Sequence, residues 1–129
     1  MNLTQELTAF YRAYLEAWNG REFDQLASFF DEPCMVATAA GGASFASRAA
    51  YQAHQRQAFA DIEARGYSHT TVGEITAAPL GPGLALLDVA DVCRMHVDGS
   101  IMERRRAHYL VRLAPDGWRF TVVASCIVG

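Results

Sequence analysis

Apolar and polar positions follow a helical period in the first half of the chain and a strand period in the second. Between residues 3 and 18 apolar side chains recur every three or four positions, and Asn19-Gly20 ends the pattern, which predicts an amphipathic helix. A shorter helix is predicted from about residue 23 to 30, and a third helix from about 47 to 66. Residues 34–40, which lie between these two helices, are predicted to form a short strand.

The second half alternates apolar and polar residues, which is the period of a β-strand. Strands are predicted over residues 67–78 and 84–97, and the Asp98-Gly99 pair that follows is typical of a two-residue hairpin turn. A further hairpin is predicted over residues 108–125. The second half should therefore form a long antiparallel sheet.

The two hairpins together predict which side chains share a face of this sheet. If Leu113 pairs with Trp118, one face carries a row of apolar and aromatic side chains, namely Tyr109, Val111, Leu113, Trp118, Phe120 and Val122. Pairing Val97 with Ser100 then places Asp88 opposite Tyr109 on the same face. A single β-bulge would break this register. The predicted chamber requires Asp88 and Trp118 to lie on one surface of the sheet.

The composition is that of one soluble domain, taken as residues 1–129. The chain is 51% hydrophobic and 19% charged, and its formal net charge of -3 provides no basic field for nucleic acid. Residues 1–18 contain acidic and polar positions where a signal peptide would be basic and apolar, and no apolar run reaches membrane-spanning length. We therefore expect a cytoplasmic protein without nucleic-acid or membrane partners. Its three cysteines lack CxxC spacing and predict neither a disulfide framework nor a zinc site.

Helices followed by long strands predict an α+β fold, in which a cone-shaped, curved antiparallel sheet wraps around a long helix, with the N-terminal helices on one face. The stretch FYRAYLEAWNGREFDQLASFF and the Gly-Trp strand of DGWRFTVVAS resemble the nuclear transport factor 2-like superfamily, including its SnoaL-like polyketide cyclases and ketosteroid isomerases. The resemblance covers essentially the whole chain. Because such folds host many activities, function must be argued from the site.

The resemblance implies catalytic positions that this sequence fills only in part. In ketosteroid isomerases a tyrosine of the first helix donates a hydrogen bond to the developing oxyanion, and Tyr14 falls where that tyrosine would lie. The position of their aspartate base corresponds to Thr38, and residues 106–108, where a second acid would lie, contain none. SnoaL-like cyclases use an aspartate near the end of the chain, but residues 118–129 contain no acid. Tyr14 is therefore either a donor to a ligand or a packed core tyrosine.

Other acid–base chemistry is predicted from Asp88 and His54. Asp88 has apolar neighbours in LLDVAD and a predicted place beside Tyr109, which would desolvate a carboxylate and suit it to general acid or base work. A shift of one residue would leave it in water instead. His54, in the third predicted helix, either faces the same interior or is an exposed structural histidine.

Two arginines and a glutamate also fall on the predicted aromatic face. Glu103 and Arg105 lie two residues apart, and Arg94 is predicted to pair with Glu103. The arrangement is either a structural cross-strand ion pair or a weak likeness to the acid–arginine–acid site of the superfamily's epoxide hydrolases.

The predicted site therefore has a catalytic and a ligand-binding set. The catalytic candidates are Asp88, Tyr14, Tyr109 and His54. The residues predicted to line an apolar pocket are Phe10, Trp18, Thr38, Tyr51, Val111, Trp118 and Phe120. No metal site is predicted, because His69, His96 and His108 share no ligand spacing with acids, and no cofactor is expected.

The opposite face of the sheet is also predicted to be partly apolar and to pair with a second copy of the chain, which forms a homodimer. The apolar residues assigned to that outer face are Ala85, Leu87, Val89, Cys93, Met95, Leu110, Val123 and Ile127.

Two functions follow from the sequence. One is acid–base chemistry of isomerase, cyclase or hydrolase type on a small apolar molecule, and the other is a non-catalytic ligand-binding or dimerisation module.

Overall fold

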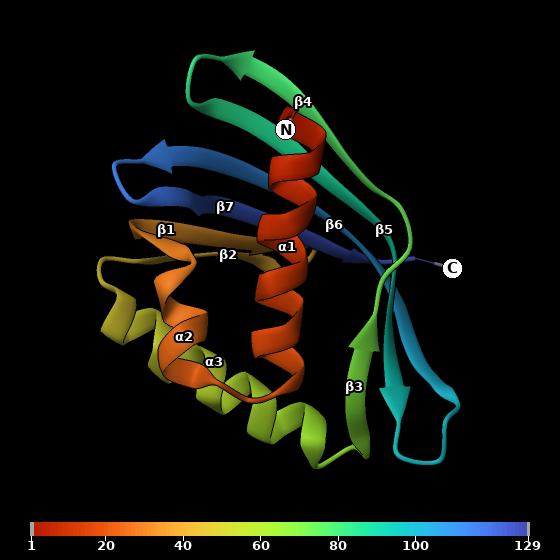
Figure 1. Cartoon of the computed structure of the whole chain (residues 1–129). Helices are drawn as coiled ribbons and strands as arrows, with labels where there is room; N and C mark the ends of the chain where they lie inside the picture. Colours follow the sequence, from red (N-terminus) through yellow and green to blue (C-terminus); the bar gives the residue numbers. More distant parts are fainter. Residues whose placement is uncertain (1, 129) are drawn as a thin grey trace.

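The computed structural model describes residues 2–128 and has the predicted α+β architecture, with helices packed against one strongly curved sheet (Figure 1). In chain order its elements are α1 (Leu3–Asn19), α2 (Phe23–Ser28), β1 (Phe30–Thr38), β2 (Gly41–Phe45), α3 (Arg48–Glu63), β3 (Tyr67–Thr71), β4 (Ile75–Gly81), β5 (Leu84–His96), β6 (Ile101–Ala114) and β7 (Gly117–Ile127).

Local side-chain hydrogen bonds fix where the two long helices begin. The Asn2 side chain accepts a hydrogen bond from the backbone N–H of Gln5 at 2.9 Å, and the Gln5 side chain accepts one from the backbone N–H of Asn2 at 3.0 Å. This reciprocal capping box satisfies N–H groups that the first turn of α1 leaves free. Ser47 caps α3 in the same way, with its hydroxyl 3.1 Å from the backbone nitrogen of Ala50.

Within residues 2–128 the strands form one seven-stranded sheet of order β2-β1-β7-β6-β5-β3, with β4 paired to β5 beside β3. All neighbouring pairs are antiparallel except β1 and β7, which run parallel. The sheet is therefore mixed, and the predicted antiparallel arrangement does not extend to the pairing of β1 with β7. β1 belongs to the first half of the chain, and the long connection from β1 to β7 permits parallel pairing.

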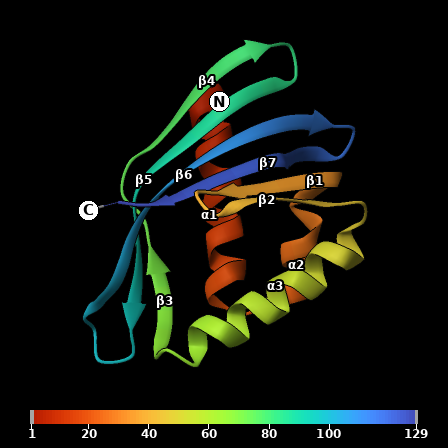
Figure 2. The same cartoon turned by 180° about the vertical axis from the view of Figure 1, so that it is seen from behind.

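The helix α3 closes the cone. It follows β2 and precedes β3, the strands at the two ends of the sheet order. Figure 2 shows α3 crossing below the sheet from the β1–β2 side toward β3. The curved sheet therefore encloses α1 on its concave side, which we call the inner face.

The bend of the sheet is concentrated in β5. Residues 84–89 of this strand pair with β4 and residues 93–96 pair with β3. Between them Ala90 exchanges hydrogen bonds of 2.9 Å with the link between β3 and β4, and Asp91 has a positive φ of 51°. Gly73 in that link has no room for a side chain, because an added Cβ would lie 3.0 Å from the Asp91 Cβ. This β-bulge turns the strand from one half of the cone to the other.

A second bulge changes the predicted faces of β6 and β7. Leu113 pairs with Trp118, as predicted, but the register then shifts by one residue. As a result Val123 lies opposite Tyr109 on the inner face. Val122 points to the outer face, so its predicted inner position is wrong.

The bulge in β5 has a larger consequence, because it reverses the faces of residues 84–89. Leu87 lies opposite Tyr109, and Asp88 lies opposite His108 on the outer face. The prediction that Asp88 shares a surface with Tyr109 and Trp118 is therefore wrong. Residues predicted to point outward are instead fully buried in the core, namely Ala85, Leu87 and Val89.

Candidate functional site

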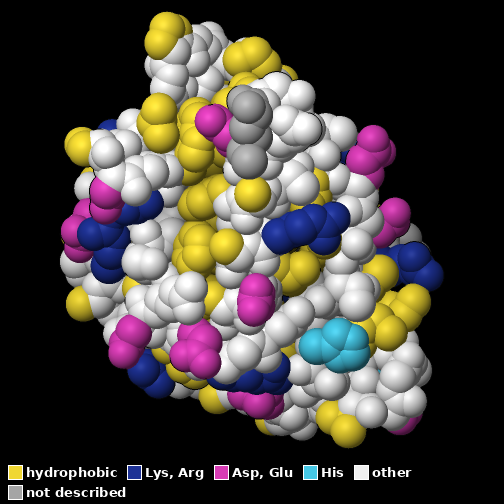
Figure 3. Space-filling view, in the orientation of Figure 1, with side chains coloured by type: hydrophobic (Ala, Val, Ile, Leu, Met, Phe, Trp, Pro, Cys, Tyr) yellow, Lys and Arg dark blue, Asp and Glu magenta, His cyan; other side chains and the backbone are white. Residues whose placement is uncertain are grey.

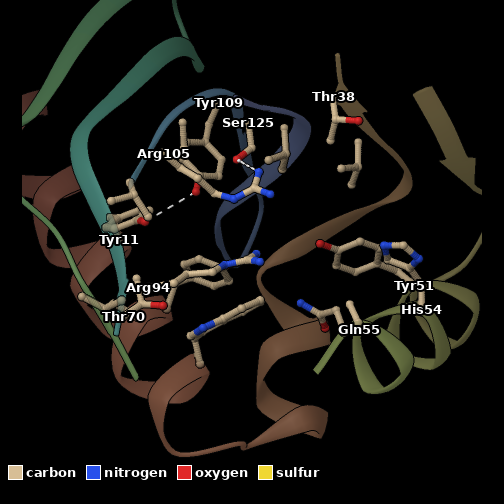
Figure 4. A pocket seen from close by; sticks show the side chains of 18 residues that line it. Tyr11, Thr38, Tyr51, His54, Gln55, Thr70, Arg94, Arg105, Tyr109 and Ser125 are labelled. Atoms are coloured by element: carbon tan, nitrogen blue, oxygen red, sulfur yellow. Dashed lines mark hydrogen bonds between the residues drawn. The ribbon is translucent and has the colours of Figure 1, made fainter. Parts of the chain in front are cut away.

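A cavity of about 220 Å³ lies between α1, α3 and the inner face of the sheet (Figure 4). Aromatic rings form much of its wall, contributed by Tyr11, Tyr14, Trp18, Tyr51 and Tyr109. Polar side chains are grouped at other parts of the wall and include Gln55, Thr70, Arg94, Arg105 and Ser125.

The helical period of α1 brings three of these rings to one face. Tyr11, Tyr14 and Trp18 follow each other at steps of three and four residues, and their neighbouring ring centroids are 5.6 and 6.2 Å apart. Trp18 is held in place because its indole N–H donates to the Tyr67 hydroxyl at 2.8 Å, which in turn lies 2.6 Å from the Thr70 hydroxyl. Trp18 is thus anchored by the protein's own groups, without a contribution from a ligand.

The tyrosine hydroxyls are suited to donating protons in hydrogen bonds rather than to removing them from a substrate. Burial raises the pKa of Tyr14 and of Tyr109 well above the usual value for tyrosine, and it raises the pKa of Tyr11 to about 12. Tyr109 donates to the Tyr11 hydroxyl over 3.5 Å. The Tyr14 hydroxyl makes no hydrogen bond with any group of residues 2–128, so it is available to a ligand.

The two arginines of the wall pair with Glu103, whose carboxylate does not itself line the cavity. The Nε of Arg105 donates to this carboxylate at 2.6 Å, and its Nη1 donates to the Ser125 hydroxyl at 3.1 Å. Arg94 lies further away, with Nη1 3.6 Å from a Glu103 oxygen, and Arg65 approaches from outside at 3.3 Å. Burial alone would raise the pKa of Glu103, but Arg105 and Arg94 outweigh it and hold that pKa below its usual value.

Gln55 is a buried polar side chain without a partner. Its side chain is 2% exposed, and neither its amide nitrogen nor its amide oxygen makes a hydrogen bond within residues 2–128. Burial raises the pKa of the Tyr51 hydroxyl, and the nearby Gln55 amide opposes this with a smaller, lowering effect. The two groups do not reach hydrogen-bond geometry. Because a buried amide normally finds partners, this residue marks a place for a ligand.

The structure brings six of the predicted site residues to the cavity wall. These are Tyr14, Trp18, Thr38, Tyr51, His54 and Tyr109. His54 is exposed and stands at the edge of the cavity, where its ring stacks on Tyr51 with centroids 5.9 Å apart and lies 4.8 Å from the ring of Phe45.

The other predicted residues do not line the cavity. Asp88 is half-exposed on the outer face, where His108 Nδ1 lies 2.5 Å from its carboxylate. Val111 and Phe120 do face inward, but both are fully buried in the packed core. The assignment of Asp88 as a pocket acid, and of these two as pocket lining, is therefore wrong.

Phe10 and Trp118 also lie outside the cavity. Phe10 packs against Phe29 and Phe120 with ring centroids 5.5 and 4.8 Å apart, and Trp118 is a partly buried residue against the same core. Figure 3 shows hydrophobic side chains gathered beside α1, toward the end of the sheet at which β6 turns into β7. These residues close the core at that end.

Some lining residues escaped the sequence analysis. Tyr11 was the apolar neighbour of Tyr14 on the same helix face, so the helical period contained the signal for it. Gln55 directly follows His54 in the third helix, and its burial (2% exposed) distinguishes it only in the structure. Arg94 and Arg105 were assigned to the correct face but interpreted mainly as an ion pair with Glu103.

The described part of the chain contains neither a cluster of potential metal ligands nor a helix that could span a membrane. Among residues 2–128 no cluster of three or more His, Cys, Asp or Glu side chains is arranged to hold a metal ion. No helix in this range combines the length and the apolar composition needed to cross a membrane.

Comparison with solved structures gives similar folds at low sequence identity. An NTF2-like protein with a cystatin-like fold from Novosphingobium aromaticivorans matches with a TM-score of 0.78 and 19% identity, over 96% of this chain and 80% of that chain. ActVI-ORFA from Streptomyces coelicolor matches with a TM-score of 0.79 and 17% identity, over 97% and 94%. A protein provisionally named a scytalone dehydratase, also from N. aromaticivorans, matches with a TM-score of 0.74 and 15% identity, over 97% and 83%.

At these identities the likeness establishes the fold alone. A comparison with curated protein sequences finds no match. The model of one protein family, described as NTF2-like protein (DUF6841), matches residues 5–127. The predicted superfamily is thereby confirmed, and the chain belongs to the NTF2-like DUF6841 family.

Proposed function

We propose that the chain binds a small ring-containing molecule in the cavity between α1, α3 and the sheet. The observation that carries this proposal is the aromatic wall, in which rings from both helices and from β6 surround one cavity. Its volume of about 220 Å³ is below the roughly 300–1,000 Å³ of sites for drug-sized ligands. A ligand of one or two fused rings therefore fits best, packed against ring faces and edges.

Filling the cavity tests this proposal. Ala58 lines the cavity from α3, whereas Ala60 is exposed on the same helix. Calorimetric titration with 2-naphthol and with 2-naphthoate should show saturable binding to the wild type and to the control Ala60→Phe. Ala58→Phe should abolish that binding while the protein stays folded by circular dichroism. If neither probe binds the wild type, or if both bind Ala58→Phe unchanged, the proposal is wrong.

A second candidate function is acid–base catalysis on the bound molecule, as the sequence suggested. The observation that favours it is the position of His54 at the edge of the cavity, because histidine is the side chain that most often acts as a general acid or base in enzymes. Buried hydroxyls such as that of Tyr14 would then donate to a developing oxyanion. One structural relative bears a dehydratase name, which is compatible with such chemistry.

Deuterium exchange separates catalysis from binding. With 2-tetralone, a neutral two-ring ketone, in D₂O, the wild type should accelerate exchange of the protons next to the carbonyl, as measured by NMR. His54→Gln should lose the acceleration and retain binding. If the exchange rate equals that in buffer, the protein binds such molecules but does not catalyse this reaction.

We also propose that the outer face of the sheet pairs with a second copy of the chain. A row of apolar side chains crosses this face on neighbouring strands, made up of Met35, Leu86, Leu110 and Val122. Met35 and Leu86 are 43% and 42% exposed. Such a contiguous apolar surface is typical of an interface. Leu110 was predicted on this face, whereas Leu86 and Val122 take the places predicted for Leu87 and Val123, because the bulges exchange the two faces there.

A further inference from the structure

The cavity wall carries more positive than negative charge. Arg94 and Arg105 both line it, with side chains 19% and 18% exposed, and the carboxylate between them belongs to Glu103. That single carboxylate is also approached by Arg65 from outside. Because partly buried cations are normally balanced by anions, the cluster is short of negative charge.

The two cavity arginines differ in how fully they are engaged. Arg105 is fixed by Glu103 and Ser125 and has further N–H groups to offer. Arg94 makes no hydrogen bond with any group of residues 2–128, and its closest carboxylate oxygen is 3.6 Å away. Its planar array of donors is therefore free to bind a carboxylate through paired hydrogen bonds.

Gln55 supplies an independent sign of a ligand across the cavity. Figure 4 shows Gln55 and Tyr51 extending from α3 toward the space that Arg94 and Arg105 approach from the sheet. The unpartnered Gln55 amide can both donate and accept a hydrogen bond. A ligand with polar groups at two ends would satisfy both walls.

We propose that the ligand is an aromatic carboxylic acid, whose carboxylate is bound by Arg94 and Arg105 and whose far end carries a polar group that hydrogen-bonds to Gln55. The ring lies between these ends, against Tyr14 and Trp18. This inference rests on the proposed binding function and names the class of molecule bound. It replaces the small apolar molecule expected from the sequence, because neither interpretation of the arginines there gave them a carboxylate of the ligand to bind.

A charged and a neutral probe of the same shape test whether the site binds the carboxylate of the ligand. Calorimetric titration should show that 2-naphthoate binds at least tenfold more tightly than the neutral 2-naphthamide, and that NaCl weakens the binding of the acid but not of the amide. Arg94→Met should abolish the preference for the acid. Arg104→Met removes the same charge from the outer face of β6, where Arg104 lies opposite Cys93, and should retain the preference.

The far end is tested by a hydroxyl group opposite the carboxylate. The variant Gln55→Leu should weaken the binding of 6-hydroxy-2-naphthoate severalfold and leave that of 2-naphthoate nearly unchanged. Equal affinity of the acid and the amide for the wild type would overturn the inference while leaving the proposed binding function intact. Failure of every naphthalene probe to bind would instead contradict the binding function. The comparison of acid with amide needs no variant, so it holds even if Arg94→Met folds poorly.

Discussion

Replacing Arg94 by methionine should leave the ligand-free protein as stable as the wild type or more stable. The ion pair with Glu103, at 3.6 Å, is worth about 4 to 5 kcal/mol at an effective dielectric constant of about 20. Two effects oppose this attraction. Desolvation of the guanidinium costs several kcal/mol per buried ion, and Arg105 repels the charge of Arg94. Burial, the largest effect, and Arg105 together lower the pKa of Arg94 despite Glu103, so the balance disfavours the charge.

The glutamate is not left unpaired in this variant. Arg105 and Arg65 still lie 2.6 and 3.3 Å from it, so the penalty for an isolated buried charge does not arise. We expect Arg94→Met to raise the free energy of unfolding by about 0 to 2 kcal/mol, within the range found when buried charges are replaced by apolar groups. Because arginine stays charged at every accessible pH, the mutation, not a pH titration, reveals this cost.

Urea unfolding, followed by circular dichroism and analysed by linear extrapolation, measures this change. Arg105→Met is the contrasting variant, because it removes the close hydrogen bonds to Glu103 and Ser125 and should destabilise the protein by about 2 to 4 kcal/mol. The same fixed concentration of 2-naphthoate should stabilise the wild type more than Arg94→Met. If Arg94→Met proves less stable than the wild type by more than about 1 kcal/mol, Arg94 is a structural ion pair and the reasoning fails.

Further predictions concern the outer face and the cavity. The pKa of Asp31 lies below its usual value, mainly because Arg112 donates hydrogen bonds to the carboxylate. Thr121 donates another, and together they outweigh the effect of burial, which raises this pKa. Their contribution to stability is present above the unfolded carboxyl pKa of 3.8 and is lost as the pH falls through the lower folded pKa. Asp31→Asn should therefore lower the free energy of unfolding by about 1 to 3 kcal/mol at pH 7. In this variant the free energy of unfolding should also fall less steeply as the pH is lowered, as measured by urea titrations at several pH values. Leu110→Lys should convert the expected dimer to monomers in sedimentation velocity, and an unchanged dimer would refute the interface. Tyr14→Phe should weaken 2-naphthoate binding about threefold to tenfold in calorimetry, and unchanged affinity would show that the hydroxyl is only packed.

The order of the elements and the class of fold could be predicted because they depend on periodicity. The helix ending at Asn19-Gly20 and the hairpin pairing of Leu113 with Trp118 were both evident from the sequence, and both are confirmed. The parallel pairing of β1 with β7 was not predictable in the same way. It depends on where a short early strand docks, which local patterns do not encode.

The faces of the strands were predictable only as far as the first bulge. Asp91 adopts a positive φ without being glycine, so the sequence gives no turn signal at the point where β5 bends. Gly73 is the one local clue, since it makes room for the bulge from the neighbouring link. Its role depends on a pairing between distant residues and could not be deduced from its own position.

The bulge in β5 also decides the chemistry of the cavity. Asp88 and Arg94 lie six positions apart, so an unbroken strand would present both side chains to the cavity, as an acid beside a cation. With the bulge between them, Arg94 faces inward and Asp88 faces outward. The polar side chains of the described cavity wall are thus cations, hydroxyls, an amide and one imidazole, without a carboxylate. Such a wall is poorly suited to a reaction that needs an aspartate as general base. It is well suited to a ligand that brings its own carboxylate, and because this carboxylate would complement the cations of the wall, we expect an organic acid as the occupant.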